Sequence, residues 1–107
     1  MPVDEASAPT GDCFEAAAKF ISQSAIVDYP DDYRLAHGNV AKLRQDQTVN
    51  HAWVEEGDLV HELSNGRHDV YSKHSYYKRH GITSVRTYTV EQALLYLARE
   101  GNWGPWD

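Results

Sequence analysis

The sequence has one cysteine and one methionine, and no apolar run approaches the roughly 18 residues that a membrane-spanning helix needs. A single cysteine cannot form a disulfide within the chain, which is typical of proteins in a reducing compartment. Residues 1–6 also lack the basic start and the apolar stretch of a secretion signal. We therefore expect a cytoplasmic protein with no membrane partner.

Positive charge is also scarce. Lys and Arg total 10 against 16 for Asp and Glu, which gives a formal net charge of -6. Because phosphate binding depends on Lys and Arg, this balance argues against nucleic acid as a partner. A basic substrate or a cationic partner surface suits this charge better. The sequence leaves the oligomeric state unknown.

Two further kinds of site are not indicated by the sequence. The histidines at His61, His68 and His74 lie close together along the chain, but they do not have the spacing of zinc ligands on one element. The chain also contains no glycine-rich phosphate-binding loop. We therefore expect no metal and no cofactor.

The pattern of apolar and turn-forming residues predicts one α+β domain over residues 11–107, preceded by a flexible N-terminal arm over residues 1–10. The expected elements, in order, are a helix over about 13–24, a strand over 33–40 interrupted at 37–39, a hairpin of 51–55 and 59–63, a short helix over 72–80, a strand over 84–88, and a helix that starts in a capping box at 89–92 and ends at Gly101. Short loops between sequential strands favour an antiparallel sheet with helices packed against it.

Cys13 is the first candidate functional residue. It follows Gly11 and Asp12, and an Asp in that position predicts a helix N-cap, so that Cys13 would lie in the first turn. Unpaired N–H groups and the helix dipole favour a thiolate there. We also expect the backbone N–H of Cys13 to face a developing oxyanion, with Thr10 or Asn50 as a side-chain donor.

A nucleophilic thiol needs a base, and His51 is the best candidate. A two-residue turn at 56–57 places His51 directly opposite Glu62 in the hairpin, whereas a turn at 57–58 makes the two residues diagonal neighbours. Both registers put them on one face of the sheet, because side chains alternate between faces, while a three-residue loop would separate them. Glu62 is therefore the expected orienting group for His51, and Asn65 is the alternative.

These residues carry a resemblance. The chain contains the segments Asp12-Cys13-Phe14-Glu15-Ala16-Ala17 and His51-Ala52-Trp53-Val54-Glu55, with Glu62 on the hairpin partner. This arrangement resembles the papain-like cysteine hydrolase superfamily, and within it the transglutaminase-like branch. The resemblance implies a papain-like α+β core, a Cys13–His51–Glu62 catalytic triad, and hydrolysis or acyl transfer at amide or thioester bonds. The substrate is then expected to be a peptide or protein, and near the triad we expect Trp53, Glu55, Asn50 and Asn65 to contact it.

Two alternatives stay open. A catalytically silent module of the same fold could bind a peptide through Trp53, Tyr76, Tyr77 and the tryptophans of the C-terminal tail. An enzyme like the ADP-ribosyltransferases is also considered, because the strand Tyr33-Arg34-Leu35-Ala36-His37-Gly38 resembles their His-Gly strand. It is less favoured, because that fold normally needs a longer chain. In that case Tyr76 or Tyr77 and Glu91 would be the partners of His37. The histidine that lines the main cleft, His37 or His51, separates this alternative from the triad.

Overall fold

The computed structural model describes residues 8–23, 26, 28, 30–41 and 48–106. In chain order the elements are α1 (Ala8–Ile21), the 3₁₀ turn η1 (Pro30–Asp32), β2 (Tyr33–Ala41), β3 (Thr48–Glu56), β4 (Leu59–Glu62), the 3₁₀ turn η2 (Ser64–Gly66), β5 (Asp69–Ser72), α3 (Lys73–His80), β6 (Thr83–Thr89) and α4 (Val90–Glu100). The predicted α+β class is confirmed.

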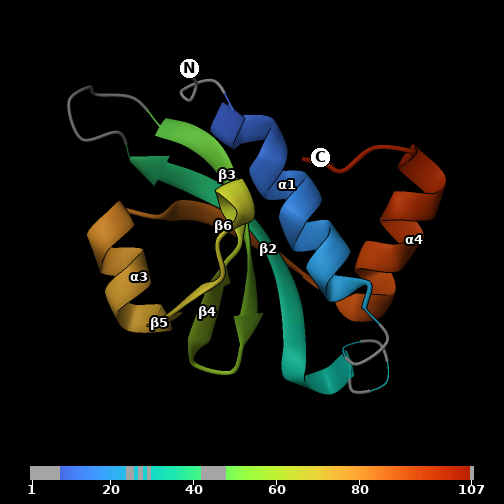
Figure 1. Cartoon of the computed structure of the whole chain (residues 1–107), viewed down its shortest axis with the longest axis horizontal. Helices are drawn as coiled ribbons and strands as arrows, with labels where there is room; N and C mark the ends of the chain where they lie inside the picture. The colour runs from blue at the N-terminus through green and yellow to red at the C-terminus, as the bar shows by residue number, and fades with distance from the viewer. Residues whose placement is uncertain (1–7, 24–25, 27, 29, 42–47, 107) are drawn as a thin grey trace.

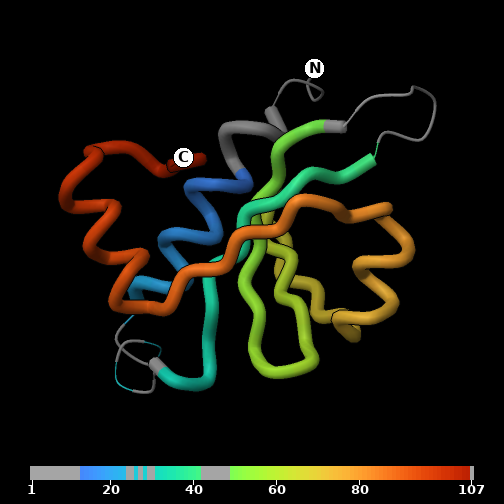
Figure 2. The backbone as a smooth tube through the Cα atoms, turned by 180° about the vertical axis from the view of Figure 1, so that it is seen from behind, coloured from blue at the N-terminus to red at the C-terminus, as the bar shows by residue number. Residues whose placement is uncertain are grey.

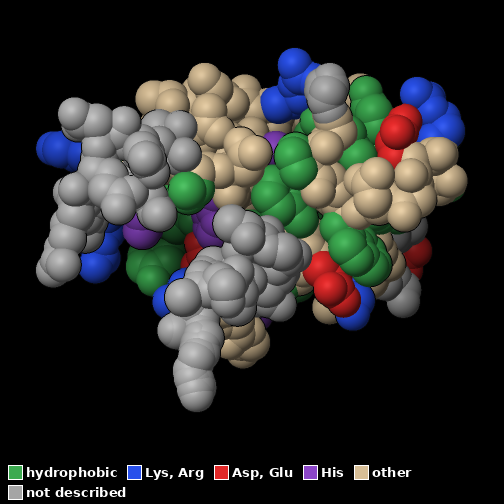
Figure 3. All heavy atoms as spheres, turned by 90° about the horizontal axis from the view of Figure 1, so that it is seen from above, with side chains coloured by type: hydrophobic (Ala, Val, Ile, Leu, Met, Phe, Trp, Pro, Cys, Tyr) green, Lys and Arg blue, Asp and Glu red, His purple; other side chains and the backbone are tan. Residues whose placement is uncertain are grey.

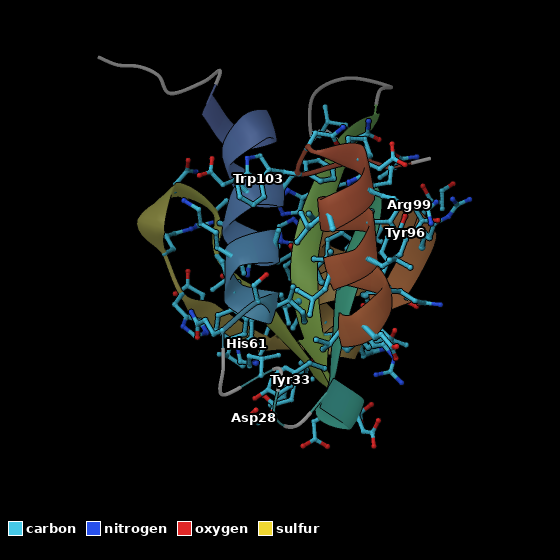
Figure 4. The ribbon with its side chains drawn as sticks, turned by 90° about the vertical axis from the view of Figure 1, so that its right-hand side faces the viewer. Asp28, Tyr33, His61, Tyr96, Arg99 and Trp103 are labelled. Atoms are coloured by element: carbon cyan, nitrogen blue, oxygen red, sulfur yellow. The ribbon has the colours of Figure 1, made fainter. Side chains whose placement is uncertain are left out.

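The strands form one antiparallel sheet in the order β5-β4-β3-β2-β6. The long helix α1 and the C-terminal helix α4 lie side by side over one face of this sheet (Figures 1 and 4). The short helix α3 lies at the other end of the molecule, after β5 and before β6, as the view from behind also shows (Figure 2). The helices α1 and α4 thus cover one face of the sheet, and α3 covers part of the other.

The buried side chains form two clusters, one on each face of the sheet. Leu35 of β2 belongs to the core under α1 and α4, whereas its neighbour Ala36 packs on the opposite face with Trp53 and Tyr76. The alternation follows from the two-residue period of a strand. The larger core contains Cys13, Phe14, Ala17, Ile21, Ile26, Leu35, Ala52, Val54, Leu63, Tyr88, Val90, Ala93 and Trp106.

The hairpin of β3 and β4 adopts one of the two registers expected from the sequence. Val54 pairs with His61 and Glu56 pairs with Leu59, so the turn consists of residues 57–58. Gly57 occupies the left-handed region with φ of 58°, which a glycine accepts without a steric penalty. Continued by one residue, this register brings Glu62 opposite Trp53 and diagonal to His51.

The capping box and the helix α4 that it starts are confirmed. The Thr89 side chain accepts from the backbone N–H of Gln92, and the Gln92 side chain accepts from the N–H of Thr89. Gly101 ends the helix in the left-handed conformation. Ser72 caps α3 and Gly81 ends it in the same way, so α3 has nearly the predicted bounds.

The first helix begins earlier than predicted. It starts at Ala8, so residues 8–10 belong to a helix and not to the arm, and residues 1–7 lie outside the described residues. The interpretation of Asp12 as N-cap was therefore wrong, because Asp12 is inside the helix. Pro9, the second residue of α1, is the signal that was missed, since proline is favoured in the first helical turn.

Two strand predictions also needed correction. The strand β2 continues through residues 37–39, where the predicted interruption appears only as a shift of register against β6. The strand β5 was not predicted, because its four residues include Asp69 and Ser72, which have low strand propensity. Its pairing with β4 outweighs that preference.

Gly38 of β2 makes room for the side chain of Trp53, which lies on the neighbouring strand β3. A Cβ atom at this position would lie 2.8 Å from Cη2 of Trp53 and 3.2 Å from Cγ2 of Val85. The indole of Trp53 therefore lies against the bare backbone of the neighbouring strand, which only glycine permits.

Candidate functional site

His51 and Glu62 meet at the point where β4 ends. The Nε2 atom of His51 lies 2.9 Å from Oε1 of Glu62. The paired part of β3 and β4 ends near Trp53, so His51 lies on a stretch of β3 that pairs with β2, through Gly38, but not with β4. The imidazole is only partly exposed, and it is stacked on the indole of Trp53 with 5.9 Å between the ring centroids.

Cys13 reaches the same imidazole from α1. A side-chain hydrogen bond joins Cys13 to His51, and it helps to raise the pKa of the imidazole. Since Nε2 is engaged with Glu62, we infer that Nδ1 is the ring nitrogen that faces the sulfur. The three side chains predicted as a triad therefore lie together, with His51 between Cys13 and Glu62.

The surroundings of Cys13 differ from the expectation. Cys13 is the sixth residue of α1, where a backbone N–H is normally bound to the carbonyl four residues earlier. Its N–H is therefore not a free donor for an oxyanion, and the argument from the helix dipole fails for the same reason. Only 1% of Cys13 is exposed, and it belongs to the core that includes Phe14 and Ala52.

The protonation of His51 and Glu62 reflects their pairing. Burial alone would lower the pKa of His51, but hydrogen bonds with Cys13 and Glu62 and the charges of both groups outweigh it and raise this pKa to about 9. Burial would raise the pKa of Glu62, yet the bonds from His51, Ser64 and Tyr76 lower it to about 2. At neutral pH the pair is therefore an imidazolium and a carboxylate.

Glu62 has further partners that the sequence analysis missed. Its Oε1 also accepts from the hydroxyl of Tyr76, and its Oε2 accepts from the hydroxyl and the backbone N–H of Ser64. Arg67 lies 3.8 Å from Oε2. Glu62 itself is 4% exposed, so these donors replace the water that a carboxylate loses on burial. Ser64 follows Glu62 by two residues, a short-range signal that could have been noticed.

Two of the residues expected to contact substrate, Trp53 and Glu55, are buried. Trp53 is 0% exposed, with its ring between His51 and Tyr77, so it supports the site from below. Glu55 is also buried, and its carboxylate is taken up by the indole N–H of Trp53, by the hydroxyl of Tyr77 and by Lys73 at 3.2 Å. Neither side chain is free to contact a substrate.

The other two predicted contacts lie at the surface. Asn50 is exposed, precedes His51 in β3, and by strand alternation faces the side of the sheet that α1 covers. Asn65 is exposed in η2, where its φ of 60° places it in the left-handed region. Since Glu62 is bound to His51, Asn65 is not needed as the orienting group.

The residues of the ADP-ribosyltransferase alternative are not brought together. His37 lies in a cage of aromatic rings on the α1 face, where Phe14, Tyr88 and Trp106 are 4.8, 5.1 and 5.1 Å away between centroids. Tyr76 packs on the opposite face of the sheet. Among the pockets described for this structure, none has His37 or His51 in its lining.

A second histidine network lies at the other end of α1. The Nδ1 atom of His61 lies 2.8 Å from Nε2 of His68, and its Nε2 atom lies 2.9 Å from Oε1 of Glu56. The ring of Phe20 lies against the imidazoles of His61 and His68. His61 is near Tyr33 at the lower end of the helix pair (Figure 4). Within the described ranges no group of three or more His, Cys, Asp or Glu side chains is arranged to hold a metal ion.

Histidine side chains also reach the upper face of the molecule beside hydrophobic ones, with Lys and Arg toward its edges (Figure 3).

No helix in the described part of the chain has the length and apolar character to cross a membrane. Comparisons of the chain with protein-family models, curated proteins and solved structures find no match. The resemblance to papain-like hydrolases therefore stays a prediction from the motifs.

Proposed function

We propose that this protein is a thiol-dependent hydrolase or acyl transferase that acts on amide or thioester bonds. One observation carries the proposal: the imidazole of His51 is bonded on one side to Cys13 and on the other to the buried carboxylate of Glu62. Acyl transfer by a cysteine requires a thiol, an imidazole and an acid arranged in this spatial order.

In the proposed reaction, the proton that leaves the Cys13 thiol is held by His51 as the imidazolium, and the sulfur attacks the carbonyl carbon of the substrate. A sulfur–carbon bond forms, and collapse of the tetrahedral intermediate breaks the bond to the leaving amine or thiol. The His51 imidazolium gives its proton to that leaving group. Water or an acceptor amine then attacks the thioester, transfers its proton to His51 and displaces the sulfur, which recovers its proton.

Glu62 acts in this reaction by holding the ring and stabilising its charge. With the pKa of His51 raised to about 9, the imidazolium persists at neutral pH. Asn50, exposed and on the α1 side of β3, is the proposed side-chain donor to the oxyanion. The substrate class is a peptide or protein, with a basic one suiting the net charge of -6.

Alkylation of the lone cysteine tests the proposal. We expect iodoacetamide to modify Cys13 in the folded chain at pH 6.5, well below the pH of about 8.5 at which an ordinary thiol ionises. His51→Gln should slow this modification at least about tenfold, whereas His74→Gln, which changes an exposed histidine on α3, should leave it unchanged. Mass spectrometry after timed quenching gives the rates.

A second candidate is favoured by the burial of Cys13, which is 1% exposed. In a catalytically silent relative of the same fold, the thiol is a small core residue. Of the aromatic residues expected to bind a peptide, Trp53, Tyr76 and Trp106 are buried, whereas Trp103 is 40% exposed and Tyr77 is partly exposed. If Cys13 reacts only after denaturation, or at the same rate with and without His51, the silent module replaces the hydrolase.

A further inference from the structure

The two oxygens of Glu62 are used in different ways. Oε2 is held by Ser64, a neighbour in sequence, through the hydroxyl and the backbone N–H. Oε1 is shared between His51 Nε2 and the hydroxyl of Tyr76, which comes from α3 on a different part of the chain. Tyr76 therefore competes with the imidazole for the charge of a single oxygen atom.

The position of the Tyr76 hydroxyl is fixed by packing. Tyr76 is 1% exposed, and its ring lies 5.6 Å from Trp53, 5.6 Å from Tyr71 and 4.7 Å from His80 between centroids. A phenol buried so completely must donate to a protein acceptor, and Glu62 is that acceptor. Burial and the nearby carboxylate of Glu62 both raise the pKa of Tyr76, so the hydroxyl keeps its proton and acts as a donor.

We propose that Tyr76 is a positioning residue that sets the basicity of His51 through Glu62. Its hydroxyl holds Oε1 toward the imidazole and withdraws part of the negative charge from that oxygen. An acceptor that carries less charge stabilises an imidazolium less strongly. This role rests on the proposed function, because it matters chemically only if His51 moves protons to and from Cys13.

Helix α3 also supplies a matched control. The next residue, Tyr77, donates its hydroxyl to the second buried carboxylate, Glu55. Tyr76→Phe and Tyr77→Phe therefore remove the same kind of bond from adjacent positions of one helix. Only the first of these bonds ends on the oxygen atom that His51 uses.

The experiment is an NMR titration of the His51 ring in the full chain and in the two variants. With Tyr76→Phe, Oε1 carries more charge, so we expect the pKa of His51 to rise above its value in the unchanged protein. The ion pair between His51 and Glu62 should then persist to higher pH. Tyr77→Phe should leave the titration of His51 unchanged while losing a similar amount of stability in urea.

Replacement of Tyr76 by 3-fluorotyrosine extends the test to a side chain that keeps its ring and hydroxyl. Fluorine makes the phenol a stronger donor, so the pKa of His51 should fall, opposite to the effect of Tyr76→Phe. If neither Tyr76→Phe nor 3-fluorotyrosine changes the pKa of His51, or if Tyr77→Phe shifts it equally, the inference is wrong. Tyr76 is then only a buried residue whose hydroxyl has a hydrogen-bond partner.

The two proposals fail separately. The titration of His51 can be followed in Cys13→Ser, where no thiol chemistry exists, so Tyr76 can be shown to act on His51 even if the hydrolase is disproved. Conversely, Cys13 alkylation that depends on His51, together with a His51 titration that Tyr76→Phe leaves unchanged, supports the hydrolase and overturns the role of Tyr76.

Discussion

His37 and His51 lie on neighbouring strands, one residue from being directly opposite each other, but on different faces of the sheet. His51 has a partner on each side of its ring, and its pKa is raised to about 9. Neither ring nitrogen of His37 has a hydrogen-bond partner among the described residues, and burial together with the charge of Arg86 lowers its pKa to about 4. Two imidazoles so close in the sheet are thus held in opposite charge states by what surrounds them.

The difference shows how the same side chain serves two purposes. On the α1 face His37 fills space between aromatic rings, where burial favours the neutral form. On the opposite face, bonds with Cys13 and with the carboxylate of Glu62 keep His51 charged. Stability should therefore depend on pH in opposite directions for the two residues.

The largest expected effect comes from opening the cage of His37. Trp106 is 5% exposed, lies 5.0 Å from Tyr96 with the rings stacked, and covers His37 from the C-terminal tail. Trp106→Ala should reduce the free energy of unfolding by about 4 kcal/mol, as for other large-to-small changes of buried aromatic residues. It should also let water reach His37 and move its pKa back toward 6.5. Urea unfolding at pH 5 and pH 8 measures both effects, and Trp103→Ala is the control because Trp103 is 40% exposed.

The second change breaks the His51 side of the comparison. Glu62→Gln leaves the imidazolium without its counter-charge, so the pKa of His51 should fall and the free energy of unfolding at pH 7 should drop by about 3 kcal/mol. Glu55→Gln removes the other buried carboxylate, and it should destabilise the fold without altering the titration of His51. An equal shift of that titration in both variants would contradict the pairing.

The smallest effect concerns pH alone. Because the pKa of His37 is about 4 when folded and near 6.5 when unfolded, the unfolded chain binds a proton first as pH falls. The contribution of His37 is fully present above pH 6.5 and is lost as pH decreases toward 4, by about 2 kcal/mol between pH 8 and pH 5. His37→Leu should remove this slope, which urea unfolding over the same range detects. The contribution of His51, with its raised pKa, is instead lost as pH rises from 6.5 through 9.

The contact between His51 and Glu62 could be predicted from the sequence because strand geometry restricts the choices. The two registers that a two-residue turn permits put these side chains on one face, and the structure adopts the register at 57–58. The helix α4 was equally well marked, by the capping box at Thr89 and by Gly101 at its end. In both cases the signal is local, so it survives without knowledge of the rest of the fold.

The remaining features depend on contacts between distant segments. Nothing near Cys13 in the sequence shows that its helix begins at Ala8 or that the thiol is buried. Tyr76 and Tyr77 look like the surface of a short polar helix, and only the packing of α3 against the sheet turns their hydroxyls toward Glu62 and Glu55. The burial of Trp53 likewise follows from the bare backbone at Gly38.

That bare backbone has a consequence for how the sequence can vary. A methyl group at position 38 would displace the indole of Trp53, and this indole is the surface on which the His51 ring rests. A variant with alanine at position 38 therefore needs a smaller ring at position 53, and the imidazole would lose its platform. Positions 38 and 53 should co-vary wherever this fold recurs, and natural variants that change one without the other should be rare.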